Sequence, residues 1–151
     1  MELLDIQGKI ETAFERVLTP YHAAGDFSVW QLIRRFFTGR PQARRIAIVA
    51  ENVEASFRAE DGAPLEWRAE VRVEIASNIK DDGEGHDDIV SRVAECLYGG
   101  AAFCAAANLA MDGEGFNALF WEADARRTSS KDGTSIKTVI VGTLEMQPWK
   151  N

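Results

Sequence analysis

Residues 65–75 read LEWRAEVRVEI, and apolar and charged side chains alternate along the whole stretch. Successive side chains of a β-strand point to opposite faces of its sheet, so this alternation predicts a strand with one buried face and one solvated face. A register error of one residue would exchange the two faces. The apolar set is Leu65, Trp67, Ala69, Val71, Val73 and Ile75, and the charged set is Glu66, Arg68, Glu70, Arg72 and Glu74.

The neighbouring segments predict two β-hairpins. Residues 45–57 are rich in β-branched side chains and precede the alternating strand across Asp61-Gly62, a favoured tight-turn pair. Near the C-terminus, NALFWEADARR (117–127) and TSIKTVIVGTLEMQPW (134–149) predict two strands joined through SSKDG (129–133). Asp132-Gly133 supplies a second turn pair there.

Helical periodicity marks the remaining segments. Apolar residues spaced by three and four positions predict an amphipathic helix over 3–18 that stops near Pro20. Ser28 and Gln31 have capping-box spacing and predict a short helix over 29–38. Two further helices are expected over 86–98 and 101–111.

These elements predict a single α+β domain spanning residues 1–151. Its sheet is expected to be mainly antiparallel, with four strands from the two hairpins. Three to four helices should pack on the face that carries Trp67, Val71, Val73 and Ile75.

Composition limits the classes of function. The formal net charge is −7, which argues against sequence-independent nucleic-acid binding because that activity needs a basic face. No apolar run is long enough to span a bilayer, and the N-terminus lacks a basic leader followed by an apolar core. Cys96 and Cys104 lie in apolar stretches without zinc-site spacing and are expected to be buried free thiols.

The stretch SNIKDDGEGHDD (77–88) combines five carboxylates with a histidine. We interpret it mainly as a loop and helix start, with a capping box formed by Asp81 and Glu84, and with Asp87 and Asp88 in the first turn. Two alternatives stay open: an intermolecular contact, and a metal or catalytic site formed by Asp82, His86 and Asp88.

Motifs for catalysis are absent from the sequence. It contains no nucleophile elbow, phosphate-binding loop, dinucleotide fingerprint or zinc-protease motif. His22 follows Pro20-Tyr21 at a helix end, where a solvated or capping role is the simpler interpretation. The sequence therefore predicts neither an enzyme nor a bound cofactor or metal.

One basic segment contrasts with the acidic background. RRFFTGRPQARR (34–45) interleaves arginines with phenylalanines, and both residue types are enriched at interface cores. The alternatives are a solvated loop and a docking patch for a neighbouring subunit, whose acidic loop over 81–88 offers complementary charge. The patch consists of Arg34, Arg35, Phe36, Phe37, Arg40, Arg44 and Arg45, and its expected partners are Asp81, Asp82, Glu84, Asp87 and Asp88.

The order of these patterns resembles that of small tail-terminator, or tail-completion, proteins of long-tailed bacteriophages and prophages. The resemblance rests on an N-terminal helix, the strand RIAIVAEN, and WRAEVRVEIASN leading through an acidic loop into a helix. It ends with FWEADARRTSSKDGTSIKTVIVGTLEMQPW and covers about residues 3–149. Residues 22–44 match nothing in that family, so their suggested role comes from composition alone.

The resemblance implies a homo-oligomeric ring, commonly a hexamer, that ends tail-tube polymerisation and offers a docking face to the head–neck complex. Expected partners are the tube protein and the neck protein, with DNA passing through without specific binding and no membrane involved. The charged face from Glu66 to Glu74 is a candidate lumen lining. The expected location is the virion tail, reached from the host cytoplasm. Alternatives are a head-completion or neck adaptor, and a metal-assisted enzyme using Asp82, His86 and Asp88.

Charge reversal offers a test of the basic patch. If Arg34 and Arg35 serve only in docking, changing both to glutamate should abolish assembly and leave the melting temperature nearly unchanged.

Overall fold

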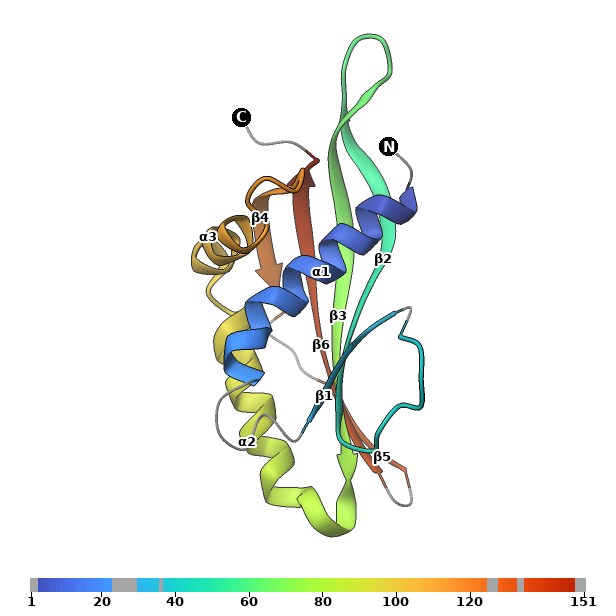
Figure 1. Cartoon of the computed structure of the whole chain (residues 1–151), viewed down its shortest axis with the longest axis vertical. Helices are drawn as coiled ribbons and strands as arrows, with labels where there is room; N and C mark the ends of the chain where they lie inside the picture. The colour runs from blue at the N-terminus through green and yellow to red at the C-terminus, as the bar shows by residue number, and fades with distance from the viewer. Residues whose placement is uncertain (1–2, 23–29, 36, 125–127, 133–134, 149–151) are drawn as a thin grey trace.

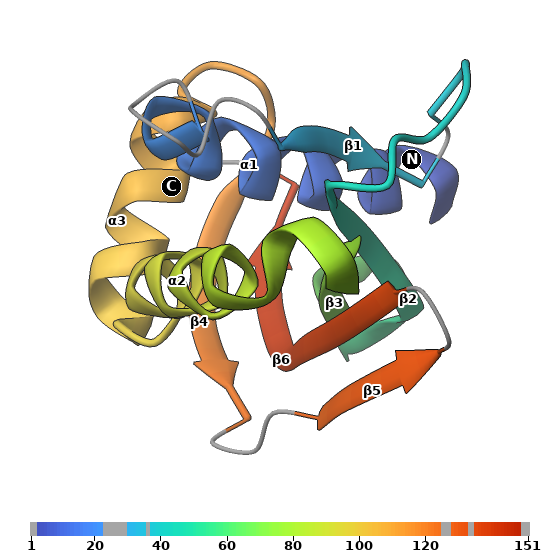
Figure 2. The ribbon, with the colours of Figure 1, turned by 90° about the horizontal axis from the view of Figure 1, so that it is seen from below.

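The structure is a computed structural model that describes residues 3–22, 30–35, 37–124, 128–132 and 135–148. Side chains of residues 3, 4, 22, 79–84 and 128–132 lie outside this description. The chain forms an α+β fold whose helices cover one face of a curved sheet (Figures 1 and 2). In chain order the elements are α1 Leu3–His22, β1 Gln31–Arg34, β2 Arg45–Arg58, β3 Pro64–Asn78, α2 Ile79–Leu97, α3 Gly100–Ala110, β4 Asn117–Ala123, β5 Thr128–Asp132 and β6 Ser135–Gln147.

The sheet has the strand order β1-β2-β3-β6-β4, and β5 pairs with β6 beside this path. β1 pairs with β2 in parallel, whereas the other pairs are antiparallel. The sheet is mainly antiparallel, as predicted, but the prediction of four strands from two hairpins was wrong, because β1 and β5 add to them and β1 is parallel to its neighbour. The α+β class and the packing of the helices on one face are confirmed.

The alternating stretch has the predicted register. Trp67, Ala69, Val71, Val73 and Ile75 are all buried, while the charged residues between them are exposed or half-buried on the other face. The turn before this strand contains Gly62 at φ 86°, as expected for the Asp61-Gly62 pair, and the Ala63 amide donates to Asp61 Oδ1 at 2.9 Å.

The predicted helix over 29–38 was wrong. Gln31–Arg34 is an extended edge strand, with Leu32 beside Ile46 and Ile33 beside Ala47. The Gln31 side chain accepts the Gln42 amide at 2.8 Å instead of capping a helix. Pairing with the parallel strand β2 thus outweighs the local capping pattern. The spacing of residues in the sequence does not reveal this partner strand.

The C-terminal region contains one strand more than predicted. SSKDG was interpreted as a connection, but Thr128–Asp132 forms β5, which pairs with Ser135–Val139. β4 occupies the same edge of β6 further along, from Gly142 to Gln147. The 13-residue strand β6 is long enough for both partners.

The core is organised around three aromatic rings from three elements. Phe14 of α1 lies 4.5 Å from Phe103 of α3 and 4.9 Å from Trp121 of β4, measured between ring centroids. The indole of Trp121 donates to the Leu97 carbonyl at 2.6 Å. These contacts fix the helices against the strands.

Helix α3 covers the free edge of β4. The Asn108 side chain accepts the Ala118 amide at 2.6 Å and donates to the Ala118 carbonyl at 3.1 Å, so it replaces a neighbouring strand at that residue. An edge protected in this way does not invite strand addition.

Two further predictions have specific outcomes. Cys96 and Cys104 are free, but they are half-buried rather than fully buried, and burial raises the pKa of both thiols.

Among the described helices, none is long and apolar enough to cross a membrane by itself. The pair 85–97 and 100–110, bent by 83°, meets that test jointly on length and composition.

A β-bulge shifts the alternation inside β2. Ile46, Ile48 and Ala50 face the core, whereas beyond Asn52 the core contacts come from Val53 and Ala55. Asn52 has φ 53°, a left-handed conformation that asparagine tolerates better than most residues. The bulge thereby lets both halves of the strand present apolar side chains to the same core.

Substitution at Asn52 is expected to depend on backbone freedom. Asn52→Gly should leave stability nearly unchanged, while Asn52→Val should lower the free energy of unfolding by about 1–3 kcal/mol, because a β-branched residue resists positive φ. Urea denaturation followed by tryptophan fluorescence measures both variants. Equal stability of the two variants would contradict the strained bulge.

Candidate functional site

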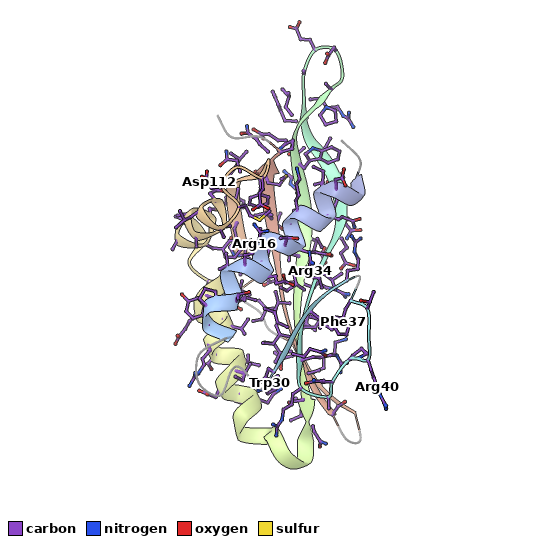
Figure 3. The ribbon with its side chains drawn as sticks, viewed as in Figure 1. Arg16, Trp30, Arg34, Phe37, Arg40 and Asp112 are labelled. Carbon is purple, nitrogen blue, oxygen red and sulfur yellow. The ribbon has the colours of Figure 1, made fainter. Side chains whose placement is uncertain are left out.

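The predicted basic patch runs from the end of β1 through the loop that follows it to Arg45, the first residue of β2. Figure 3 shows Arg34 beside α1, and Phe37 and Arg40 on the loop beyond β1. Arg34 pairs with Glu15 of α1 at 3.0 Å and donates to Thr12 Oγ1 at 2.6 Å. The first arginine of the patch therefore binds the edge strand to the helix of its own chain.

Arg35 continues this attachment at a more buried position. Its Nε lies 3.3 Å from Glu11 Oε2, and the Glu11 side chain is only 3% exposed. Glu11 also accepts the Ala50 amide at 2.9 Å, so one carboxylate connects α1, the residue that follows β1, and β2. Burial raises the pKa of Glu11, whereas the Ala50 amide, Arg35 and Arg34 oppose that rise.

These contacts correct the expectation for charge reversal of the patch. Placing glutamates at 34 and 35 would set carboxylates against Glu15 and Glu11, so a nearly unchanged melting temperature is no longer expected. The remaining members differ: Arg40 is exposed, Arg44 is half-buried, and Arg45 donates to the Gln42 carbonyl at 3.1 Å. Phe36 lies outside the described residues.

A groove of about 390 Å³ lies between α1 and β1, and the ion-paired residues Glu11, Glu15 and Arg34 belong to its lining. Its lining combines the apolar Leu32, Ile33 and Phe37 with Glu11, Glu15 and Arg34. Gly8 of α1 leaves space in this wall, because a Cβ added there would meet nothing within 4 Å. The Phe37 side chain is 38% exposed at the rim.

A second, shallower hollow of about 470 Å³ adjoins the groove and shares Gly8 and Arg34 with it. Lys9 and Arg16 add two cations to its lining. Arg16 pairs with Glu114, which lowers the pKa of that carboxyl, and Lys9 donates to the Gly115 carbonyl at 3.4 Å. The hollow therefore mixes these cations with the carboxylates of Asp5 and Glu114, which also line it.

The acidic stretch is placed differently from the prediction. Helix α2 begins at Ile79, so Asp81 and Glu84 cannot form a capping box before it, and Asp87 and Asp88 lie beyond its first turn. Side chains of Asp81, Asp82 and Glu84 are outside the described residues. Asp87 and Asp88 are exposed, and Asp88 pairs with Arg92 at 3.2 Å one turn later. Among the described side chains, neither Asp87 nor Asp88 forms an ion pair with the arginines of residues 34–45 in the same chain.

His86 is a core residue rather than part of a solvated loop. It is 1% exposed, with Nδ1 2.5 Å from Ser77 Oγ and Nε2 2.8 Å from Thr138 Oγ1. The hydroxyls can act as donors or acceptors, so both ring nitrogens have partners in either tautomer. Its ring also lies near Trp30, with centroids 6.1 Å apart. His86 joins β3, α2 and β6, which favours a structural role.

This placement weakens the alternative of a metal-assisted enzyme. The imidazole of His86 points into the core while Asp88 is exposed. Among the side chains that the structure describes, no three His, Cys, Asp or Glu residues converge as metal ligands. The position of the Asp82 side chain lies outside that description.

The charged face of β3 carries ion pairs to its neighbouring strands. Arg68 pairs with Glu145 at 2.8 Å, and Arg72 pairs with Glu51 at 3.0 Å. Glu74 is 3.2 Å from Lys137. Together with Glu66 and Glu70, these residues give the face both signs of charge, on the side of the sheet away from the helices.

Three features of the structure were not predicted from the sequence: the buried Glu11, the bulge in β2 and the groove between α1 and β1. Glu11 stands among Ile10, Ala13 and Phe14 on the apolar stripe of the first helix, and a carboxylate at such a position signals a buried partner. The change of alternation within residues 45–57 signals the bulge in β2. The groove depends on β1 lying beside α1, which no local pattern indicates.

Comparison with known proteins gives no family for the chain. No protein-family model matches it, and no curated protein matches it either.

Glu11 gives the domain a specific pH dependence. Because burial raises its pKa in the folded state, Glu11 binds its proton more readily there than in the unfolded chain, and its contribution to stability falls as pH rises past the unfolded value of 4.5. Glu11→Gln lacks this titration. The stability of the variant relative to the wild type should therefore increase with pH across this range, measured by urea denaturation at several pH values.

Glu114→Gln is the matched control with the opposite sign. Arg16 lowers the pKa of Glu114 in the folded state. The wild-type carboxylate therefore stabilises the fold above its unfolded pKa, and this stabilisation is lost as the pH falls. The effect should be small because this pair is exposed. A Glu11→Gln difference that is constant with pH would show that Glu11 is not desolvated.

Proposed function

We propose that the chain is a non-catalytic assembly protein that forms a ring, as large as a hexamer, at the head-proximal end of a phage tail tube. In this role it would end tube polymerisation and present a docking face to the neck. The feature that supports the proposal most is the hairpin of β2 and β3, whose tip projects beyond the helices (Figure 1). Such an arm suits a subunit that reaches a neighbour.

The surfaces of the domain agree with this role. The side of the sheet away from the helices mixes ion-paired acids and bases, so a lumen lined by it would not hold DNA strongly. The exposed Phe37 and Arg40 leave a basic, aromatic patch on another surface. Arg40, Arg44 and Arg45 remain candidates for contacts with the acidic residues 81–88 of a neighbour or with the tube.

Deletion of the gene from the phage or prophage genome that carries it tests the proposal. Without a tail terminator, electron microscopy should show tubes of unregulated length that lack heads. Without a head-completion or neck adaptor, the runner-up function, tails should keep their normal length while heads lose DNA or fail to join. Normal joined particles would overturn both proposals.

A further inference from the structure

The tip of the β2–β3 hairpin, residues 58–64, extends past the other described elements (Figure 1). None of its residues is buried, so no core contact holds it in one position. In the described part of the chain, β6 pairs with β3 only from Trp67 onward, and the tip is attached through the two strands of the hairpin alone. A two-stranded hairpin without a covering layer is only marginally stable in water. The position of the tip therefore depends on the strand pairing directly below it.

The hairpin tip itself is well formed. The Ala59 amide donates to the Ala63 carbonyl and the Gly62 amide to the Ala59 carbonyl, both at 2.9 Å. Arg58 donates to the Gly62 carbonyl and the Ala63 amide to Asp61 Oδ1, each also at 2.9 Å. All of these bonds lie within the tip, so it keeps its shape if it moves relative to the rest of the domain.

The pairing below the tip is irregular on both strands. The paired positions, taken from the domain toward the tip, are Ala55 with Trp67, Phe57 with Glu66, and Arg58 with Pro64. Ser56 of β2 and Leu65 of β3 thus have no partner on the opposite strand. A bulge disrupts the ladder locally and bends the strand that carries it. The pair of Phe57 and Glu66 stands alone between two such irregularities and is the weakest attachment along the hairpin.

The side chains at this point do little to fix one arrangement. Ser56 Oγ is buried and has no hydrogen-bond partner among the described residues. An unbonded buried hydroxyl raises the free energy of the arrangement that buries it. Phe57 is 56% exposed, so its ring contributes little packing. Neighbouring orientations of the tip therefore cost little relative to the one in the structure.

The domain below the irregular pairs is held firmly. Helix α1 binds both outward backbone groups of Ala50, because Glu11 accepts its amide at 2.9 Å and Gln7 donates to its carbonyl at 3.1 Å. On the other side, β6 pairs with β3 as far as Trp67, which is buried. Ala55, opposite Trp67, still packs against the core. The firmly held part of the hairpin thus ends at the pair of Ala55 and Trp67.

We infer that the hairpin tip swings as one rigid unit about the pair of Phe57 and Glu66, while the domain up to Ala55 and Trp67 stays fixed. Such a motion changes the backbone angles of a few residues at the hinge and breaks no core contact. It carries the exposed Glu60 and Asp61 through a range of positions, so the tip can follow a partner surface before binding fixes it. The hinge is a property of the fold and is independent of the proposed function.

Residual dipolar couplings of the full chain in a dilute aligned medium test the hinge. The N–H, N–C′ and C′–Cα couplings of residues 58–64 should fit one alignment tensor of their own. Its magnitude should be lower than that of the rest of the domain by about a third or more, as order parameters of flexible and rigid backbone differ. Detection of a deuterated chain by TROSY gives these values for a monomer and for a ring alike. Tip couplings that fit the tensor of the domain at full magnitude, or that fit no common tensor, would overturn the inference.

Two variants locate the hinge at the bulge. Deletion of Ser56 removes the residue that has no partner, so the tip should align with the same magnitude as the rest of the domain. Ser56→Ala is the matched control, because it removes the hydroxyl but keeps the extra residue, and its tip should stay as weakly aligned as in the wild type. Couplings of residues outside the hairpin check that both variants fold. An unchanged tip after the deletion, in a domain with native couplings, overturns the hinge, and if the deletion prevents folding the wild-type tensors still decide.

Discussion

Replacement of Phe14 by alanine is expected to lower the free energy of unfolding by about 3–5 kcal/mol. Phe14 is fully buried and contacts both Phe103 and Trp121. Its ring lies where α1, α3 and β4 meet, so its loss removes apolar burial and leaves a cavity that neighbouring rings can fill only by moving. Urea denaturation monitored by tryptophan fluorescence measures the change.

A matched control comes from an exposed phenylalanine. Phe120→Ala removes the same ring from a side chain that is 45% exposed on β4, and its cost should be near 1 kcal/mol or less. Similar losses for the two variants would mean that the aromatic cluster is not the centre of the core. Since Phe14 does not line the groove, any change in assembly by Phe14→Ala should follow its loss of stability.

The sequence predicted well where one face of an element is buried and the pattern is long. Residues 65–75 alternate over eleven positions, and only one register keeps Val71 and Val73 in the core. The helices predicted over 3–18 and 101–111 are present as Leu3–His22 and Gly100–Ala110, although the first continues through Pro20, where a stop was predicted. In these elements many side chains are buried together, so the observed arrangement has a lower free energy than its alternatives.

Prediction failed where pairing partners decide the structure. β1 has only four residues, and its extended form depends on hydrogen bonding to Arg45–Ile48. β5 depends in the same way on the first half of β6. For α2, the acidic residues suggested a helix start, but the helix begins at Ile79, directly after β3. Short segments carry too little local signal to reveal such partners.

The candidate site illustrates the same limit. The arginine segment was recognised from composition, yet composition did not separate arginines that stabilise the fold from those that remain exposed. Arg35 faces the buried Glu11, whereas Arg40 is exposed and forms no ion pair among the described side chains. A test of the patch must therefore treat the two positions separately.

Arg35→Glu is expected to lower the free energy of unfolding by about 3–5 kcal/mol, because it replaces a partly buried ion pair with two carboxylates. Arg35 is 21% exposed and Glu11 is 3% exposed, so solvent screens this repulsion weakly. Arg40→Glu should change stability by about 0.5 kcal/mol at most, since Arg40 is exposed. Equal stability of the two variants in urea denaturation would show that Arg35 does not stabilise the domain through Glu11.

A double-mutant cycle identifies Glu11 as the cause. Adding Glu11→Gln to Arg35→Glu removes the repulsion and keeps an oxygen that can accept the Ala50 amide, so the double variant should regain part of the lost stability. If the two losses simply add, the two side chains are not coupled.

Measurements of association test whether the exposed part of the basic patch is an interface. Arg40→Glu changes the patch in a domain that stays stable, so weaker association of this variant would assign the exposed part of the patch to an interface. Unchanged association at low and high salt would leave the arginines near residue 35 with a structural role in holding β1 on α1.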